Sequence, residues 1–446
     1  HAQTREPSMR IGVSLLCALV LVGLLYRGSM AEEIPTFDLS EIEKEVEKKP
    51  YAFGGFLQVQ PTLSGLDRDS ALYKLKFYED EPGAAVEESN LGARLEGAFQ
   101  YGDLSAFARL DSFFTHDPNG WNGKMTLMEG YLSFKPGPHM AVEAGKRVTK
   151  WGKGYAWNPV SFVDRPKNPE DPEEALEGYY ILGGDFIRSL DGPLQTLAFT
   201  PVILPVYEDI NDEFGQTGHV NVAAKLYALL YDTDLDLLFF TGASRTTRLG
   251  FDFSRNLLSN LEIHGEAAWI SDFKELTFQE NGQVLTNESD VWSYLVGTRY
   301  LTETDLTAIF EYYHNGEGVN PGDLQNLYTY IDRAYDNYQQ TGNRSPFGPI
   351  NRLTKEGFSW RNPLRDYLYL RLTQKEPFDI LYFTPAFTTI VAMNDWSFNL
   401  MPELNYSPIT NLEMRLRGII PVGGDQTEYG EKQSDWRVEL RLRYFF

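Results

Sequence analysis

Apolar and polar residues alternate along most of the chain, and the pattern is clearest at its end. From Trp436 to Phe446 every second residue is apolar, and Arg437, Glu439 and Arg441 stand between them. Side chains of a strand alternate between two faces, so this segment predicts a strand with one apolar and one strongly charged face. An edge strand of a soluble sheet is the simpler alternative. A strand with lipid on one side and water on the other fits the pattern better.

The same alternation recurs from Tyr51 to the chain end. Leu91, Ala93 and Leu95 share one face of a second segment, for example, while Arg94 and Glu96 share the other. The pattern predicts about eighteen strands, with sixteen as the alternative. They are expected to begin near residues 51, 91, 104, 124, 139, 179, 194, 220, 234, 249, 260, 292, 305, 366, 381, 398, 412 and 436.

Two kinds of connection alternate between these strands. Short turns rich in glycine, proline, asparagine and aspartate occupy the even-numbered connections. Long segments fall at odd-numbered connections, namely 65–87, 150–178, 204–218, 271–289, 315–364 and 423–434. The odd-numbered connections near Ser244 and Asp395 are exceptions, because they are short. Short turns at one end and long loops at the other are typical of membrane barrels. We therefore predict an all-β fold, a transmembrane up-and-down antiparallel β-barrel over residues 51–446.

The N-terminal residues predict export. An apolar run follows Arg10 and ends at a small-residue cleavage site at Ala31, so residues 1–31 are interpreted as a signal peptide with an upstream extension, 1–8. A signal anchor is the alternative. Residues 32–50 predict a short periplasmic helix, begun by Asp38 or Ser40 and ended by Pro50, or else a disordered leader.

Composition narrows the range of functions. The net charge of −23 argues against nucleic-acid binding. The single cysteine, Cys17, lies in the predicted signal, so we expect neither disulfides nor cysteine metal sites in the rest of the chain. The six histidines have no metal-binding spacing, and no nucleophile motif is present. We expect no enzymatic activity, no cofactor and no metal. The 14% aromatic content suits the aromatic girdles of a membrane barrel.

The final strand ends on an aromatic residue, Phe446, with no polar tail. This ending resembles the C-terminal strand of Gram-negative outer-membrane β-barrels, which the barrel assembly machinery recognises. The resemblance implies location in the bacterial outer membrane. It implies the assembly machinery, outer-membrane lipid and lipopolysaccharide as partners, with a possible periplasmic partner.

Residues 145–169 form the most distinctive internal segment. It is rich in glycine, tryptophan and proline, carries Trp151 and Trp157, and runs into an acidic stretch at 170–174. It is similar to a segment of poorly characterised large outer-membrane barrels that are grouped with porins and with lipid- or polysaccharide-export channels. We predict a loop that folds into the lumen and forms a constriction, with its tryptophans stacking on sugars or anchoring at the membrane interface. An external loop with an aromatic belt is the alternative.

Basic residues are the candidates for the lumen wall. Neighbouring strands near the chain end predict a ladder of arginines, partly compensated by Glu413 and Glu439. Mutual neutralisation around trapped water is the alternative to a role in guiding solute. The residues expected to line the pore or its constriction are Arg94, Arg109, Arg147, Lys150, Arg415, Arg437 and Arg441.

The longest loop, 315–364, predicts an amphipathic helix. Apolar residues recur at helical spacing between Asp323 and Gln340, and Asp323 is a candidate cap. The loop could cover the pore, enter it or form a surface cap without a gating role. The chain is therefore predicted to be a porin-like channel for passive diffusion of small hydrophilic solutes or of one specific polar substrate. The alternative is a plugged barrel for surface polysaccharide attachment or export, or a sheath for a periplasmic partner.

Overall fold

The computed structural model describes residues 50–79, 82–117, 120–355 and 358–446. The predicted signal peptide and all of the predicted leader helix except Pro50 lie outside the described residues. Within the described residues the chain forms eighteen strands of one sheet. Their bounds are β1 Tyr51–Leu66, β2 Ala85–Tyr101, β3 Leu104–Asp117, β4 Gly120–Gly137, β5 Met140–Arg147, β6 Tyr179–Ser189, β7 Leu194–Val206, β8 His219–Leu230, β9 Thr233–Thr241, β10 Arg248–Leu258, β11 Leu261–Phe278, β12 Val284–Leu301, β13 Leu306–His314, β14 Asp366–Gln374, β15 Phe383–Ala392, β16 Ser397–Ile409, β17 Leu412–Val422 and β18 Ser434–Phe445.

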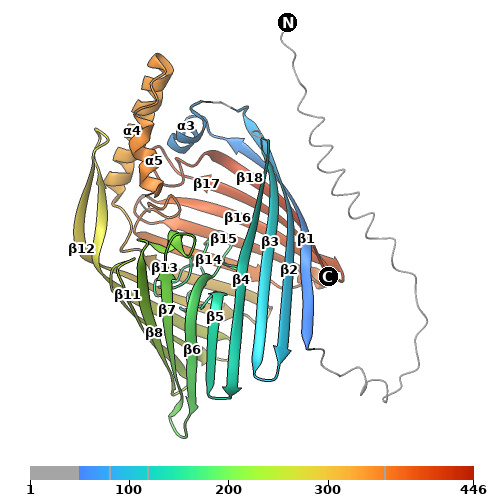
Figure 1. Ribbon diagram of the computed structural model, residues 1–446. Coiled ribbons are helices and arrows are strands. Elements are labelled where there is room, and N and C mark those ends of the chain that lie inside the picture. Colours follow the sequence, from blue (N-terminus) through green and yellow to red (C-terminus); the bar gives the residue numbers. More distant parts are fainter. Residues whose placement is uncertain (1–49, 80–81, 118–119, 356–357) are drawn as a thin grey trace.

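The sheet closes on itself as a barrel (Figure 1). Each strand pairs antiparallel with its neighbours in sequence, and β1 pairs with both β2 and β18. The closing register places Phe56 opposite Phe445 and Gln58 opposite Arg443. A closed ladder satisfies the backbone hydrogen-bonding groups internally, as hydrocarbon surroundings require. The predicted antiparallel barrel is confirmed, with eighteen strands rather than sixteen.

The outer surface of the barrel is apolar. Leu95 is 42% exposed and Trp292 is 57% exposed on this surface. The alternate residue Arg94 turns inward and pairs with Asp111 of β3. The alternation in the sequence thus separates a face suited to lipid from a charged interior.

The predicted connection 271–289 is wrong in extent. β11 and β12 continue as a paired hairpin up to Phe278 and Val284, so only residues 279–283 form the turn. The hairpin extends beyond its neighbours (Figure 1, yellow). Lys274 lies opposite Glu288 in this extension. Polar residues interrupt the apolar positions of this extension, so it lacks the regular alternation that identified the other strands.

Helices gather at the end of the barrel that carries the long loops, hereafter the long-loop end (Figure 1). No helix of the described residues is long and apolar enough to cross a membrane. Short 3-10 turns lie at Asp212–Phe214 and Pro377–Asp379. The α-helices are α3 Ala71–Phe77, between β1 and β2, and α4 Pro321–Thr341 and α5 Phe347–Lys355, both between β13 and β14. Of these, only α4 was predicted.

The start of α4 corrects the predicted cap. The helix begins after Asn320, because Pro321 suits the first helical position and lacks an N–H that would need a partner. Asp323 therefore lies inside the first turn. Its carboxylate accepts hydrogen bonds from Phe278 N at 3.1 Å and from the Asn320 side chain at 3.2 Å. Asp323 thus ties the helix to the end of β11.

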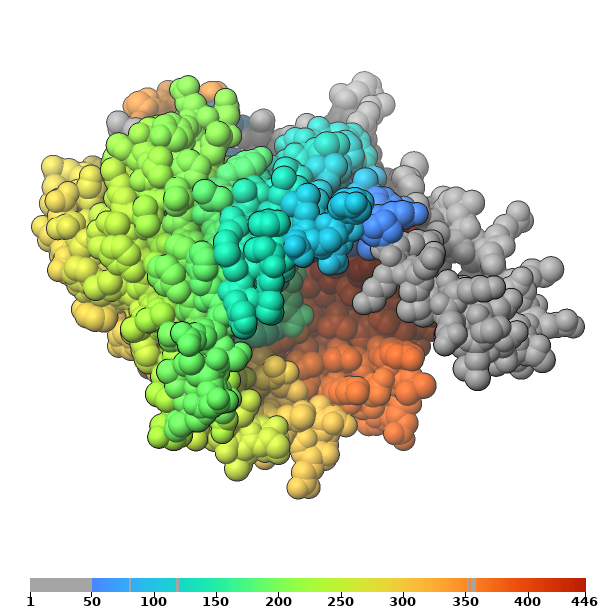
Figure 2. Space-filling view, turned by 60° about the horizontal axis from the view of Figure 1, so that its bottom comes forward, coloured from blue at the N-terminus to red at the C-terminus, as the bar shows by residue number. Residues whose placement is uncertain are grey.

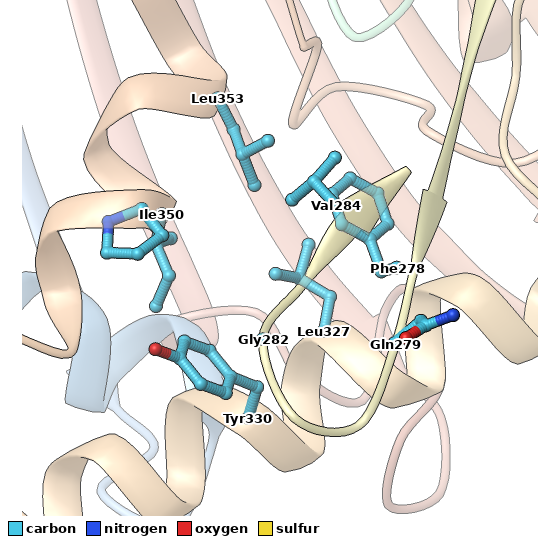
Figure 3. Close-up of a pocket in the computed structure, with 9 residues that line it drawn as sticks. Phe278, Gln279, Gly282, Val284, Leu327, Tyr330, Ile350 and Leu353 are labelled. Atoms are coloured by element: carbon cyan, nitrogen blue, oxygen red, sulfur yellow. The ribbon is translucent and has the colours of Figure 1, made fainter. Parts of the chain in front are cut away.

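Four loops pack together as a roof over the long-loop end. The roof is formed by the described residues of the segments 67–84, 279–283, 315–365 and 423–433. Lys74 of α3 forms an ion pair with Asp332 of α4 at 2.6 Å. Figure 3 shows the apolar side chains between the hairpin turn, α4 and α5, including Phe278, Leu327 and Ile350. Because α3 follows β1 and α4 follows β13, their contact crosses the barrel mouth above β14–β18.

Candidate functional site

The connection between β5 and β6, residues 148–178, enters the barrel and is called the lumen loop. Trp151 is 2% exposed, and Ala156 and Val160 are fully buried. The loop contacts Glu311 of β13 on one wall and Arg415 of β17 on another. Of the two predicted arrangements, the structure therefore has the loop inside the barrel rather than outside it.

Two buried wall carboxylates hold the backbone of the lumen loop. Glu266 of β11 accepts hydrogen bonds from Lys153 N at 2.5 Å, Gly154 N at 2.6 Å, Asn158 Nδ2 at 3.0 Å and Val160 N at 3.3 Å. Buried carboxylates and buried backbone N–H groups both need hydrogen-bond partners. The wall and the loop therefore satisfy one another.

Glu311 of β13 holds the next turn of the loop in the same way. It accepts from Ala156 N at 2.9 Å and also from Tyr155 N. His264 of β11 lies 2.9 Å from the same carboxylate. Glu311 is fully buried, so these groups replace the water that a free carboxylate would bind.

Asp164 organises the loop from within. Its carboxylate accepts from Thr149 N at 2.6 Å, from the Thr149 hydroxyl at 2.7 Å and from Trp151 N at 3.2 Å. The Ser161 hydroxyl donates at 3.0 Å. The contacts with residues 149–151 bring the start of the loop back against Asp164, so the first half of the loop forms a compact turn.

The two loop tryptophans lie in apolar clusters. Trp157 stacks on Tyr313 of β13 with ring centroids 5.1 Å apart. Trp151 packs in a second cluster with inward-facing residues of β6–β9, among them Val202 and Phe240. Both rings are buried, at 7% and 2% exposure. Neither ring is free to stack on a sugar or to anchor in lipid, because loop insertion uses both for packing.

The acidic end of the loop meets the arginines of β17 and β18. Asp171 lies 2.7 Å from Arg415 and 3.7 Å from Arg417, and Glu170 lies 3.2 Å from Arg437. Burial alone would raise the pKa of Asp171, but the combined effect of Arg415 and Arg417 is larger and opposite. The pKa therefore lies below its ordinary value. The carboxylate stays charged and bridges the loop to the arginine wall.

A cavity of about 970 Å³ remains between the lumen loop and one side of the barrel. β1–β4 and β14–β18 form its walls, and residues 165–177 of the loop form its other face. Figure 2, turned to bring the short-turn end forward, shows a hollow between the blue-to-cyan strands and the orange-to-red strands. The opposite half of the lumen is filled by the loop and its apolar cluster.

No protein-family model matches the chain, and no curated protein matches it in sequence. The solved structure of OpdQ from Pseudomonas aeruginosa is similar over 89% of this chain and 97% of its own, with 10% identity and a TM-score of 0.50. This chain has the fold of the outer-membrane porins.

Two further solved structures show weaker likeness. OccAB3 from Acinetobacter baumannii has 12% identity over 89% of this chain and 99% of its own, with a TM-score of 0.49. Wzi from Escherichia coli, described as a carbohydrate-binding β-barrel involved in group 1 capsule assembly, has 9% identity over 92% and 89%, also with a TM-score of 0.49. Such likeness concerns the fold and leaves the solute open.

The structure divides the predicted lumen residues into two groups. Arg94, Arg415, Arg437 and Arg441 line the cavity. Arg94 pairs with Asp111 at 2.6 Å, and Arg441 pairs with Glu413 at 2.7 Å. These four residues therefore come together on one water-accessible surface.

The other three predicted residues do not line this cavity. Arg109 lies between Glu96 and Glu129, at 2.6 and 2.7 Å. Arg147 pairs with Glu143, four residues before it. Lys150 is exposed at the entrance of the lumen loop. Carboxylates of the neighbouring strands therefore pair with Arg109, and a carboxylate of its own strand pairs with Arg147. Neither pairing was predicted.

Sequence reasoning missed Arg371 of β14 as a cavity residue. It pairs with Glu403 of β16 at 3.1 Å. Arg371 follows Tyr367 and Tyr369 at a spacing of two residues, so it shares their inward face, and this spacing was the available signal. Among the described residues, no group of three or more histidines, cysteines or acidic residues is arranged to hold a metal ion.

Proposed function

We propose that this protein is an outer-membrane channel through which small hydrophilic solutes diffuse passively. The observation that carries the proposal is the cavity of about 970 Å³ between the acidic end of the lumen loop and the arginine wall. Wall carboxylates fix the loop, so the route is confined to one half of the barrel.

The charges across this route suit solutes that carry both signs. Glu173 and Glu174 are exposed on the loop side of the cavity. Arginines of β2, β14, β17 and β18 face them from the wall. A solute with separated charges can align between the two faces and replace part of its hydration there. Most of the wall arginines are paired with carboxylates, so the wall carries little net charge. It therefore binds the solute weakly enough to release it.

The barrel surface supports a membrane location. Its outward aromatic and aliphatic side chains are exposed to the surroundings rather than packed, and we propose that they contact outer-membrane lipid and lipopolysaccharide. The long-loop end then faces the cell exterior. The strand that ends at Phe446 is the proposed contact with the assembly machinery.

Swelling of liposomes that contain the folded barrel tests permeation directly. A pentose and glycine should enter and cause rapid swelling, whereas a large oligosaccharide should not. Matched liposomes without protein give the baseline. Equal swelling rates with and without the barrel, for every solute, would contradict the channel.

A second candidate is a plugged barrel with a role in surface attachment. One observation favours it: a continuous apolar cluster runs from Trp157 in the lumen to Leu324 and Ile331 of the roof. This cluster fills much of the long-loop end. A folded barrel that permits no solute entry would favour this second function.

A further inference from the structure

Arg443 of β18 is the ladder arginine with no carboxylate within ion-pair distance, as far as the described residues show. The ladder comprises Arg415, Arg417, Arg437, Arg441 and Arg443. The pairs of the other four are Arg415–Asp171, Arg417–Glu439, Arg437–Glu170 and Arg441–Glu413. Arg443 lines the same cavity, so one guanidinium reaches the water-filled route without a matching negative charge.

Neutral groups hold this guanidinium in a fixed orientation. Its Nε and Nη2 donate to Gln58 Oε1 at 3.0 and 2.7 Å. Its plane lies over the ring of Phe56, 4.1 Å from the centroid. Gln58 is 6% exposed, and its own amide donates to Gln60 at 3.1 Å. The orientation is therefore set before any solute arrives.

The charged neighbours of Arg443 are already occupied. Glu413 lies opposite it in the sheet register but binds Arg441 at 2.7 Å. Arg94, 5.0 Å from the ring of the same Phe56, donates to both oxygens of Asp111 at 2.6 Å. The three arginines Arg94, Arg441 and Arg443 therefore share two carboxylates, Asp111 and Glu413, and one positive charge remains at Arg443. An uncompensated, partly buried charge is unfavourable, and an anion would stabilise it.

We propose that Arg443 is an oxyanion subsite for the permeating solute. A carboxylate or phosphate group binds the guanidinium edge that Gln58 leaves free, since the planar fork of arginine matches both groups. The site lies at the short-turn end of the ladder. Arg443 is paired in the sheet register with Glu413 of β17, and the next pair, Leu412 with Tyr444, borders the turn before β17. This inference rests on the proposed channel function and specifies its solute class as organic or phosphate anions and zwitterions.

Planar-bilayer recordings with the folded barrel test the subsite. Inorganic phosphate and acetate are the probes, added separately on the short-turn side, and reversal potentials in a KCl gradient give the ion selectivity. Arg443→Gln should shift the reversal potential towards cation preference and weaken the block by the probes several-fold. Arg443→Lys should retain much of the block, because it keeps the charge. Arg188→Gln, which removes the same charge outside the cavity, should change neither quantity.

Each outcome bears on the site. Loss of block by both probes in Arg443→Gln supports a general oxyanion site, and loss of block by phosphate alone restricts it to phosphate. Equal block in wild type and Arg443→Gln overturns the inference while the channel function stands. If Arg443→Gln does not fold, Gln58→Leu, which removes the orienting acceptor, should weaken the block instead.

Calorimetry separates failure of the site from failure of the channel. A wild-type barrel without conductance contradicts the channel function. Binding of phosphate to the detergent-solubilised wild type, absent in Arg443→Gln, would still support the subsite. Absence of binding to both proteins would overturn it.

Discussion

Arg415 on β17 and Asp171 in the lumen loop are 244 residues apart in sequence and form an ion pair at 2.7 Å. The pair fixes the acidic end of the loop against the wall that carries the ladder. It also removes part of the positive charge from the route. The position of one loop carboxylate thus controls both the width and the charge of the proposed channel.

Asp171→Asn should make the channel more anion-selective. The change leaves Arg415 without its closest partner, and breaking such a buried pair costs on the order of 3 kcal/mol. The reversal potential should move towards chloride, and current noise should increase as the loop loosens. Asp191→Asn, in a short turn outside the cavity, is the charge-matched control. Unchanged selectivity would show that Asp171 does not face the conducting route.

Glu266→Ala should release the middle of the lumen loop. The backbone N–H groups of Lys153 and Gly154 lose their acceptor inside the barrel, and each hydrogen bond to a charged group contributes about 1.5–3 kcal/mol. The midpoint of urea unfolding should fall, and the open-channel current should become larger and noisier. Glu303→Ala, in an exposed turn, should behave as wild type. An unchanged midpoint and quiet current would mean that the wall does not hold the loop.

Trp157→Ala should destabilise the barrel through the apolar cluster. Removing a buried tryptophan typically costs about 3–5 kcal/mol, because the neighbours cannot close the space. Trp292→Ala, on the outer surface, is the matched control and should have a smaller effect. Comparable losses in the two variants would contradict the interior position of Trp157.

The roof should loosen as pH rises. Burial raises the pKa of Glu428 to about 7, and Asp395 adds to the effect, although Lys432 and the Tyr367 hydroxyl oppose it. A carboxyl group with a raised folded-state pKa contributes stability that is complete below its ordinary pKa of 4.5 and is lost as pH rises through about 7. Hydrogen exchange in residues 423–433 should therefore be slower at pH 5 than at pH 8, after correction for intrinsic rates.

Glu428→Gln is the control for this pH effect. The amide cannot ionise, so most of the difference in corrected exchange between pH 5 and pH 8 should disappear. A difference that persists in this variant would assign the pH dependence to another group.

The strands were predictable because their signal is local. Lipid on one side and water on the other impose alternation on each strand separately, as at Leu95 and Arg94. The extension of β11 beyond its neighbours lacks that contrast and was missed. The helix α4 was found from its own periodicity, whereas its first turn depends on a distant contact between Asp323 and Phe278.

The site was only partly predictable because it is built from distant contacts. Trp151 and Trp157 have the composition of an interfacial or sugar-binding loop, and only the pairing of the loop backbone with Glu266 and Glu311 explains their burial. The sequence did contain a signal for the half of the lumen that the loop fills. Inward positions of β7 and β9, such as Val202 and Phe240, are apolar, which a water-filled lumen would not require.

Single-channel conductance of the folded barrel, residues 32–446, in a planar bilayer tests the central claim most directly. The open half of the lumen predicts stable, ohmic steps, with selectivity that responds to Asp171→Asn. Absence of steps from protein that migrates as a folded, heat-modifiable barrel would contradict the channel and would favour the plugged barrel.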